Sequence, residues 1–308
     1  MLIITALLCA SAFLISYISV PLTVPLCRIT GAIDIPDGVR KLNTAPIPRL
    51  GGIAIYAAVL IVLFPFISKD ETVGAILAGG AILLAGGVCD DTYDLSPIAK
   101  LVIQLSAAAV AIAIAGVPTS FSLLGVFNIP LITPIGFAIV LLRMIFTTNA
   151  VNFSDGLDGL ASGISVSALF AMAILGQYSG NVYPATAALV IGFAVLGFLP
   201  FNKYRARVYM GDCGAQFLGL SIALLSVGTS PRGAYTLESS LFLAVPALDT
   251  AVAVVRRILR GKNPLKADRG HLHHLLLDRG VPHPEASRLL TALSALIATG
   301  TLLVIFNT

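Results

Sequence analysis

The stretch from Thr72 to Cys89 reads TVGAILAGGAILLAGGVC and carries no charged side chain. A helix that crosses a lipid bilayer needs about 20 mostly apolar residues, and small residues such as Gly and Ala allow it to approach its neighbours closely. The stretch is continuously apolar, whereas the strands of a transmembrane β-barrel alternate between apolar and polar residues. We therefore predict a membrane-spanning helix that lies inside a helical bundle.

Similar apolar stretches recur along the whole chain. Its 308 residues are 57% hydrophobic and only 11% charged, with a mean hydropathy of +0.96, whereas soluble domains carry about 25% charged residues. The predicted fold class is all-α, a single polytopic membrane domain over residues 1–308. We predict ten transmembrane helices, at about 2–23, 50–67, 72–89, 100–118, 129–146, 159–178, 182–201, 213–230, 237–255 and 289–307.

Positive charges are divided unequally between the gaps that separate these spans. Of the 19 Lys and Arg residues, Lys69 and Arg232 lie in one set of gaps, and the others lie in or beside the alternate set. Positively charged loops stay on the cytoplasmic side of a membrane. We therefore predict that both termini are extracytoplasmic and that the cytoplasmic gaps are 24–49, 90–99, 147–158, 202–212 and 256–288. The chain has no basic run interleaved with aromatic residues, so we expect no nucleic-acid partner.

A first cluster of acidic residues follows the stretch that ends at Cys89. Asp90 and Asp91 come directly after it, Asp94 comes shortly afterwards, and Lys100 begins the next apolar stretch. Neighbouring carboxylates repel each other unless a cation screens them, and Mg²⁺ prefers oxygen ligands. We expect a cluster that suits Mg²⁺, with Lys100 as a phosphate-binding cation. The alternative is that these aspartates only cap the following helix.

A second polar motif, TTNAVNFSDGLDGLASG, spans residues 147–163. Glycines within it permit close approach of a ligand to the backbone. Polar groups beside a membrane span are costly, so we expect them to hold a nucleotide or a metal-bound phosphate and not to form a plain polar cap. The side chains that recur every three positions, and so share one side of a turn, are Asn149, Asn152, Asp155 and Asp158.

The motif VYMGDCGAQFLG, at residues 208–219, sets Asp212 between two glycines at the start of an apolar stretch. An aspartate at this position serves either as a helix cap or as a ligand on the same side as the other clusters. Tyr209 precedes it and can stack on a flat base.

The remaining motifs are a histidine cluster and a basic loop. ADRGHLHHLLLDRG, at residues 267–280, contains His271, His273 and His274. Imidazoles suit a diphosphate and proton transfer, although the segment also fits an amphipathic loop at the interface. The proline-rich loop at 34–52 carries Arg40 and Lys41, which either bind a lipid phosphate or anchor the loop at the membrane surface.

These motifs together, in this order, resemble the polyprenyl-phosphate N-acetylhexosamine-1-phosphate transferases. The resemblance extends from about Gly31 to Arg288 and rests on the Asp pair, NAxNxxDGxDGLA, MGDxG and HLHH. It implies a multi-pass enzyme of a bacterial inner membrane with a cytoplasmic active site. The implied reaction transfers a HexNAc-1-phosphate, above all GlcNAc-1-phosphate, from a UDP-sugar to undecaprenyl phosphate and releases UMP.

The resemblance also implies roles for individual residues. Asp90 and Asp91 match the catalytic aspartate pair of the family, and the three histidines match its histidine motif near the diphosphate. Asp212 matches the Mg²⁺ ligand, with Asn152 assisting and Mn²⁺ as a second suitable ion. Together with the expectations above, the candidate substrate-binding residues are Lys100, Asn149, Asp155, Asp158, Tyr209, Arg40 and Lys41.

Several alternatives stay open at this point. Cys213 and Ala215 depart from the residues usual in the family, which leaves the donor sugar open and includes phospho-MurNAc-pentapeptide translocase activity. A transporter also carries intramembrane carboxylates, but near the bilayer midplane, whereas here they lie at the ends of predicted spans. Direct attack by the lipid phosphate and a covalent aspartyl intermediate are both compatible with the motifs, as are a monomer and a homodimer.

Overall fold

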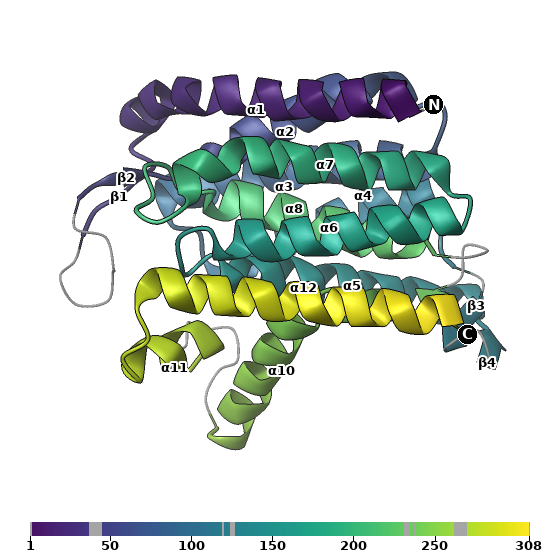
Figure 1. Cartoon of the computed structure of the whole chain (residues 1–308). Helices are drawn as coiled ribbons and strands as arrows, with labels where there is room; N and C mark the ends of the chain where they lie inside the picture. The colour runs from purple at the N-terminus through teal and green to yellow at the C-terminus, as the bar shows by residue number, and fades with distance from the viewer. Residues whose placement is uncertain are drawn as a thin grey trace.

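Long apolar helices lie side by side in a bundle, as the computed structural model in Figure 1 shows. The structure describes residues 2–36, 45–118, 120–123, 127–230, 235–236, 238–261 and 270–307. Within these residues, eight helices are long and apolar enough to cross a membrane: α1 (Leu2–Thr30), α3 (Glu71–Tyr93), α4 (Pro97–Ala115), α5 (Thr133–Ser154), α6 (Leu160–Tyr178), α7 (Val182–Asn202), α8 (Gly211–Gly228) and α12 (His283–Asn307). A shorter apolar helix, α2 (Gly51–Leu63), continues into the 3₁₀ turn η1 (Phe64–Phe66). The predicted all-α polytopic fold is confirmed.

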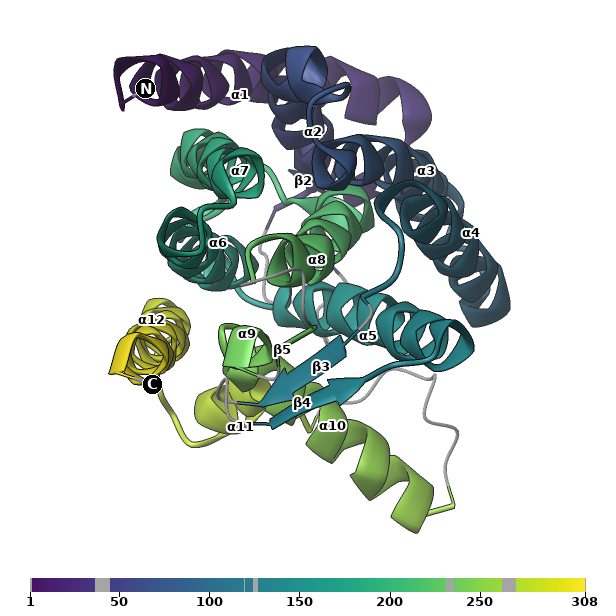
Figure 2. The same cartoon turned by 90° about the vertical axis from the view of Figure 1, so that its right-hand side faces the viewer.

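Helix α8 occupies the centre of the bundle. Figure 2 shows it end-on between α2, α3, α5, α6 and α7, and it contacts all five of these helices. Every residue from Cys213 to Ser226 is buried. Because α8 is shielded from lipid on all sides, the side chains at its N-terminus face other helices.

Glycines bring α8 into backbone contact with its neighbours. A Cβ atom added at Gly87 of α3 would lie 2.3 Å from the Cα atom of Cys213. A Cβ atom added at Gly52 of α2 would lie 2.2 Å from the Cα atom of Gly214. Small residues at these crossings therefore permit main-chain contact, which places the C-terminal end of α3 directly beside the N-terminus of α8.

The prediction of a single span over 237–255 is wrong. The segment forms two helices, α9 (Glu238–Leu241) and α10 (Ala244–Leu259), which are interrupted at Phe242 and Leu243. Helix α10 leaves the direction of the bundle at a steep angle (Figure 1). Pro246 lies in the first turn of α10 and has no N–H to donate to the carbonyl of Phe242, so a continuous helix is interrupted there.

Short strands lie at the two ends of the bundle. At one end, β1 (Ile33–Asp34) pairs antiparallel with β2 (Ile47–Pro48). At the other end, β3 (Ser120–Leu123) pairs antiparallel with β4 (Phe127–Pro130) and parallel with β5 (Tyr235–Thr236). The short helix α11 (Leu272–Asp278) lies at the β1–β2 end, and both ends of the chain lie at the opposite end (Figure 1).

Candidate active site

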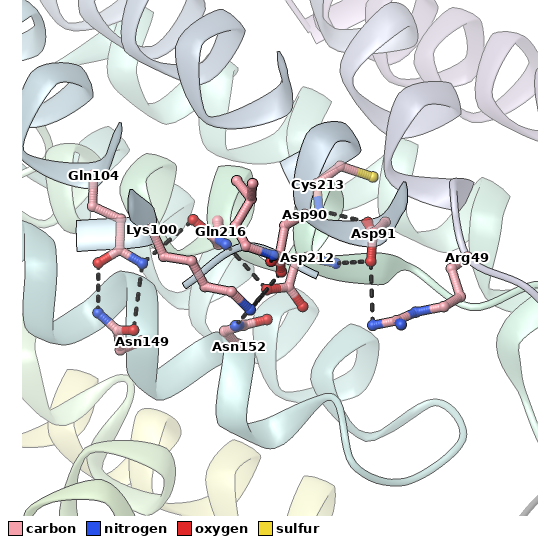
Figure 3. A network of polar contacts seen from close by, with 11 residues as sticks. Arg49, Asp90, Asp91, Lys100, Gln104, Asn149, Asn152, Asp212, Cys213 and Gln216 are labelled. Atoms are coloured by element: carbon pink, nitrogen blue, oxygen red, sulfur yellow. Dashed lines mark hydrogen bonds and ion pairs between the residues drawn. The ribbon is translucent and has the colours of Figure 1, made fainter. Parts of the chain in front are cut away.

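Polar side chains from distant parts of the chain meet in one network of contacts, which Figure 3 shows from close by. The network lies at the β1–β2 end of the bundle, because Arg49 directly follows β2. The side chains come from the C-terminal ends of α3 and α5 and the N-terminal ends of α4 and α8. The predicted loop at 147–158 is in part helical, because α5 continues to Ser154 and carries both Asn149 and Asn152. The polar residues therefore stand on rigid elements and hold their relative positions.

Asp91 is bound to the N-terminus of α8. Its carboxylate accepts hydrogen bonds from the backbone N–H groups of Asp212 and Cys213, both at 3.2 Å, and lies 3.3 Å from a guanidinium nitrogen of Arg49. The side chain of Asp91 is 0% exposed. The first N–H groups of a helix lack intrahelical partners and carry partial positive charge. Asp91 therefore caps α8 from the neighbouring helix α3.

Asp90 points to the other side, towards α4. Its Oδ2 atom lies 2.5 Å from Nζ of Lys100, and its Oδ1 atom accepts a hydrogen bond of 2.9 Å from the backbone N–H of Leu95. The same Nζ atom lies 3.2 Å from Oδ2 of Asp212. One ammonium group thus screens two carboxylates that would otherwise repel each other.

The Oδ2 atom of Asp212 accepts three hydrogen bonds. The donors are Lys100 at 3.2 Å, Asn152 at 3.3 Å and Gln216 at 3.3 Å. The amide chain continues deeper into the bundle, because Gln104 donates to Gln216 over 3.4 Å. These contacts come from α4, α5 and α8, so Asp212 is oriented by three helices (Figure 3).

Gln104 and Gln216 were missed by the sequence analysis, although a signal was present. Gln104 also exchanges hydrogen bonds with Asn149, one of them at 2.8 Å. Both glutamines stand four positions after a charged site residue, Lys100 or Asp212, inside an apolar stretch. Residues four apart share one face of a helix, so a polar residue at that spacing points towards the same polar centre.

A cavity of about 280 Å³ opens beside Asp212. Burial, together with the charges of Asp212 and Asp91, raises the pKa of Asp155 well above its usual value. The cavity therefore favours a ligand or ion that brings positive charge to its acidic side. Its charged, amide and aromatic lining residues are Asp34, Arg49, Asn152, Asp155, Asp158, Asn202, Tyr209, Asp212, His274 and His283.

Asp158 holds two loops of the cavity together. Its Oδ2 atom accepts a hydrogen bond of 3.0 Å from the N–H of Ala206, and its own N–H donates to Nε2 of His283 over 2.9 Å. His283, the fourth histidine, begins α12 and was missed because it stands apart from the HLHH motif. Tyr209 is fixed through its backbone, which bonds to Pro48 and Gly51.

The three predicted histidines divide between the cavity and the protein interior. His274 lines the cavity. His273 is packed against Gly156, and burial, with the neighbouring His274 and His271, lowers its pKa to about 3. Its ring is therefore neutral at physiological pH.

His271 is held by Asp249 of α10. Its Nδ1 atom lies 3.0 Å from Oδ2 of Asp249, whose Oδ1 accepts a hydrogen bond of 2.9 Å from the N–H of Leu272. Asp249 is thus a further positioning contact for the histidine motif. The predicted residues Arg40 and Lys41 lie outside the described residues.

A magnesium ion needs several oxygen ligands around one point. Across the described part of the chain, no group of three or more His, Cys, Asp or Glu side chains is arranged to hold a metal. Asp90 and Asp212 approach the same point, where Lys100 now lies, and the side chain of Asn152 adjoins it. Mg²⁺ is usually bound by one or two carboxylates together with substrate phosphates. The carboxylate of Asp212 and the amide of Asn152 therefore fit an ion that is completed by a diphosphate.

The fold and the site define a polytopic membrane enzyme whose polar centre lies at helix ends, where a lipid and a water-soluble substrate can meet. The chain belongs to glycosyl transferase family 4, whose sequence pattern matches residues 73–230. The resemblance seen in the motifs is thereby confirmed.

Several relatives match this chain over most of its length. It is 37% identical to the probable undecaprenyl-phosphate N-acetylglucosaminyl 1-phosphate transferase of Bacillus subtilis, over 88% of this chain and 78% of the relative. It is 32% identical to the decaprenyl-phosphate N-acetylglucosaminephosphotransferase of Mycolicibacterium smegmatis, over 98% of this chain and 82% of the relative. It is 27% identical to the undecaprenyl-phosphate alpha-N-acetylglucosaminyl 1-phosphate transferase of Escherichia coli, over 89% of this chain and 77% of the relative.

Proposed function

We propose that this enzyme transfers GlcNAc-1-phosphate from UDP-GlcNAc to a polyprenyl phosphate, giving polyprenyl-diphosphate-GlcNAc and UMP. The observation that carries the proposal is the meeting of Asp90, Lys100, Asn152 and Asp212 beside an open cavity. The relatives support the same reaction, because each is named as an N-acetylglucosamine phosphate transferase acting on undecaprenyl or decaprenyl phosphate.

The chemistry requires two anionic phosphates to approach each other. Asp212 and Asn152 would hold the metal ion, and when bound it would neutralise the donor diphosphate and stabilise the leaving UMP. Lys100, released from one of its two carboxylates, positions a phosphate as a compact cation. Most of the rate enhancement in phosphoryl transfer comes from such placement of charge.

Within the aspartate pair, we assign the reacting role to Asp90. The oxygens of Asp91 are occupied by two amides and a guanidinium, and its side chain is 0% exposed. Asp90 accepts the proton of the lipid phosphate as that phosphate attacks the donor. A covalent aspartyl route would instead let the enzyme exchange labelled UMP into UDP-GlcNAc without any lipid. The measurement of that exchange separates the two routes.

We also propose that the site faces the cytoplasm of a bacterial cell membrane and that both termini face the opposite side. The asymmetric distribution of Lys and Arg supports this orientation. Cysteine labelling in intact cells tests it. A cysteine placed at the exposed Arg207 should be protected from an impermeant reagent, and one placed at the exposed Tyr178 should react.

The reaction is tested with the purified full-length protein, undecaprenyl phosphate and a panel of UDP-sugars. UDP-GlcNAc should give a lipid-linked product, and preferential use of UDP-MurNAc-pentapeptide would favour the translocase alternative. A chelator should stop turnover, and Mg²⁺ or Mn²⁺ should restore it. Asp212→Ala should abolish transfer, whereas Asp278→Ala, which removes an exposed carboxylate of α11, should not. Full turnover in excess chelator would remove the metal from the mechanism.

A further inference from the structure

The cavity beside Asp212 presents a charge problem for a nucleotide diphosphate. Four carboxylates line it, those of Asp34, Asp155, Asp158 and Asp212. A diphosphate that entered would be repelled by the ionised members of this group unless positive charge faced it. Among the described residues that line the cavity, Arg49 is the only one with a guanidinium or ammonium group.

The backbone of Arg49 is held in place by main-chain contacts. Its N–H donates a hydrogen bond of 3.1 Å to the carbonyl of Ala32. Its own carbonyl oxygen lies against Gly211, where an added Cβ atom would approach to 1.9 Å. Gly211 also has a φ of 72°, a conformation that favours glycine. The start of the Arg49 side chain is therefore fixed relative to the N-terminus of α8.

The guanidinium is oriented by Asp91 but is not enclosed. One of its nitrogens lies 3.3 Å from Oδ1 of Asp91, and the Arg49 side chain is 34% exposed, compared with 0% for Asp91. A guanidinium has five N–H donors in a planar fork. Asp91 engages one side of the fork, so the donors on the exposed side remain available to a ligand in the cavity.

We propose that Arg49 binds the diphosphate of the donor nucleotide in this cavity and that Asp91 is the residue that positions Arg49 for this contact. The inference deepens the proposed function and rests on it for the identity of the nucleotide. A forked guanidinium matches paired phosphate oxygens, which gives a strong charge-assisted contact. Arg49 thus adds a fixed positive charge to the acidic wall of the cavity, beside the metal ion that the proposed function places at Asp212.

The test compares ligands that differ only in phosphate content. Binding of UDP and of uridine to the full-length protein is measured by calorimetry in Mg²⁺ buffer, together with KM for UDP-GlcNAc and for undecaprenyl phosphate. Arg49→Gln should weaken UDP by at least about tenfold, as expected for hydrogen bonds to a charged group. Uridine affinity and KM for the lipid should change by less than about twofold, since neither involves the donor diphosphate.

Arg207→Gln is the matched control. Arg207 is exposed at the same end of the molecule, and its guanidinium lies 5.1 Å from the ring of Phe201 and does not line the cavity. The variant removes the same charge and should leave UDP affinity unchanged. If both variants weaken UDP binding equally, the loss of positive charge at this end of the molecule, and not a direct contact from Arg49, explains the effect. The inference is then overturned.

Two further outcomes decide the inference. Unchanged UDP affinity in Arg49→Gln, or an equal loss of uridine affinity, would overturn it. Should Arg49→Gln fail to fold, Arg49→Lys carries the test, because lysine keeps the charge but lacks the fork. It should weaken UDP by about threefold or more, and wild-type affinity would overturn the inference. If wild-type protein binds UDP through Arg49 but transfers no sugar phosphate, the proposed function fails and the binding role stands.

Discussion

Replacing Asp91 with alanine should weaken the fold, although the adjacent Asp90 tolerates a neutral substitution. The carboxylate of Asp91 accepts the N–H groups of Asp212 and Cys213 and is fully buried. Asp91→Ala leaves both amides at the start of α8 without their acceptor. The change therefore loosens the helix at the centre of the bundle.

The expected size follows from these contacts. Hydrogen bonds to a charged group contribute about 1.5–3 kcal/mol each, and the loss of a helix N-cap costs about 0.5–2 kcal/mol. The two bonds share one capping function, so we expect a total of about 2–4 kcal/mol. The ion pair adds little, because Arg49 is 34% exposed and can turn to water. The unfolding temperature should fall by about 5 °C or more.

Asp90→Asn should leave the unfolding temperature nearly unchanged. An asparagine keeps an oxygen for the N–H of Leu95, which now bonds Asp90 at 2.9 Å. The substitution removes a negative charge that faces Asp212 across Lys100, and it leaves Lys100 with one carboxylate partner. Activity should nevertheless be lost, because Asp90 is the carboxylate assigned to react with substrate.

A thiol-reactive dye provides the assay on detergent-purified protein. The chain has no Trp, but Cys9 and Cys27 are buried and become reactive as the bundle unfolds. Asp91→Asn serves as the graded control, since its side-chain oxygen still accepts an N–H bond, and it should lose about 1 kcal/mol. An Asp91→Ala protein that melts with the wild type, while Asp90→Asn melts early, would refute the assignment of the cap to Asp91.

Three further substitutions test the packing and charges around the site. Gln216→Leu removes a hydrogen-bond donor to Asp212, the proposed metal-binding carboxylate, and should raise the Mg²⁺ concentration for half-maximal activity about tenfold. The control Ser221→Ala also removes a buried hydrogen bond of α8, but further along the helix, and should leave this Mg²⁺ concentration unchanged. Since the pKa of His273 is lowered from 6.5 to about 3, its neutral ring contributes stability that is complete above pH 6.5 and is lost as the pH falls towards 3. The unfolding temperature should therefore fall less between pH 7 and pH 5 in His273→Gln than in wild type. Gly87→Ala should cost about 1–3 kcal/mol by overpacking, whereas Gly300→Ala, with nothing within 4 Å, should cost nothing.

Each of these expectations has a clear contrary result. An unchanged Mg²⁺ requirement in Gln216→Leu would show that the amide does not orient the carboxylate. A pH profile of stability that is identical with and without His273 would remove that imidazole as its source. Equal melting of Gly87→Ala and Gly300→Ala would contradict the close crossing of α3 and α8.

Features set by local pattern were predictable from the sequence. The apolar stretch at 72–89 forms most of α3. Asp90, Asn152 and Asp212, which come from three separate motifs, meet on the same side of the bundle as expected. Composition alone requires such helices, because a chain with 11% charged residues cannot cover a water-facing surface. The polar residues then have few places to lie except a shared interface.

Features set by tertiary contact were not predictable. Asp90 and Asp91 are adjacent in sequence but point about 100° apart around a helix, so their different roles depend on where α4 and α8 lie. The partnership of Arg49 with Asp91 joins two segments that only the fold brings together. The break at Phe242 and Leu243 is an exception, because Pro246 has no N–H to donate to the carbonyl of Phe242 and so marks the interruption in the sequence.

The glycine crossings also bear on how this enzyme can evolve. Gly87 and Gly52 contact the backbone of α8, so a larger residue at either position would push the helices apart. Selection should therefore keep both glycines. Lipid-facing positions can change during evolution, whereas the spacing of the reactive carboxylates stays the same. Substitutions that adapt the enzyme to a new donor sugar, or make it resistant to a competing drug, should therefore occur in the loops that line the cavity. The contacts of Gly52 and Gly87 with α8 should stay unchanged.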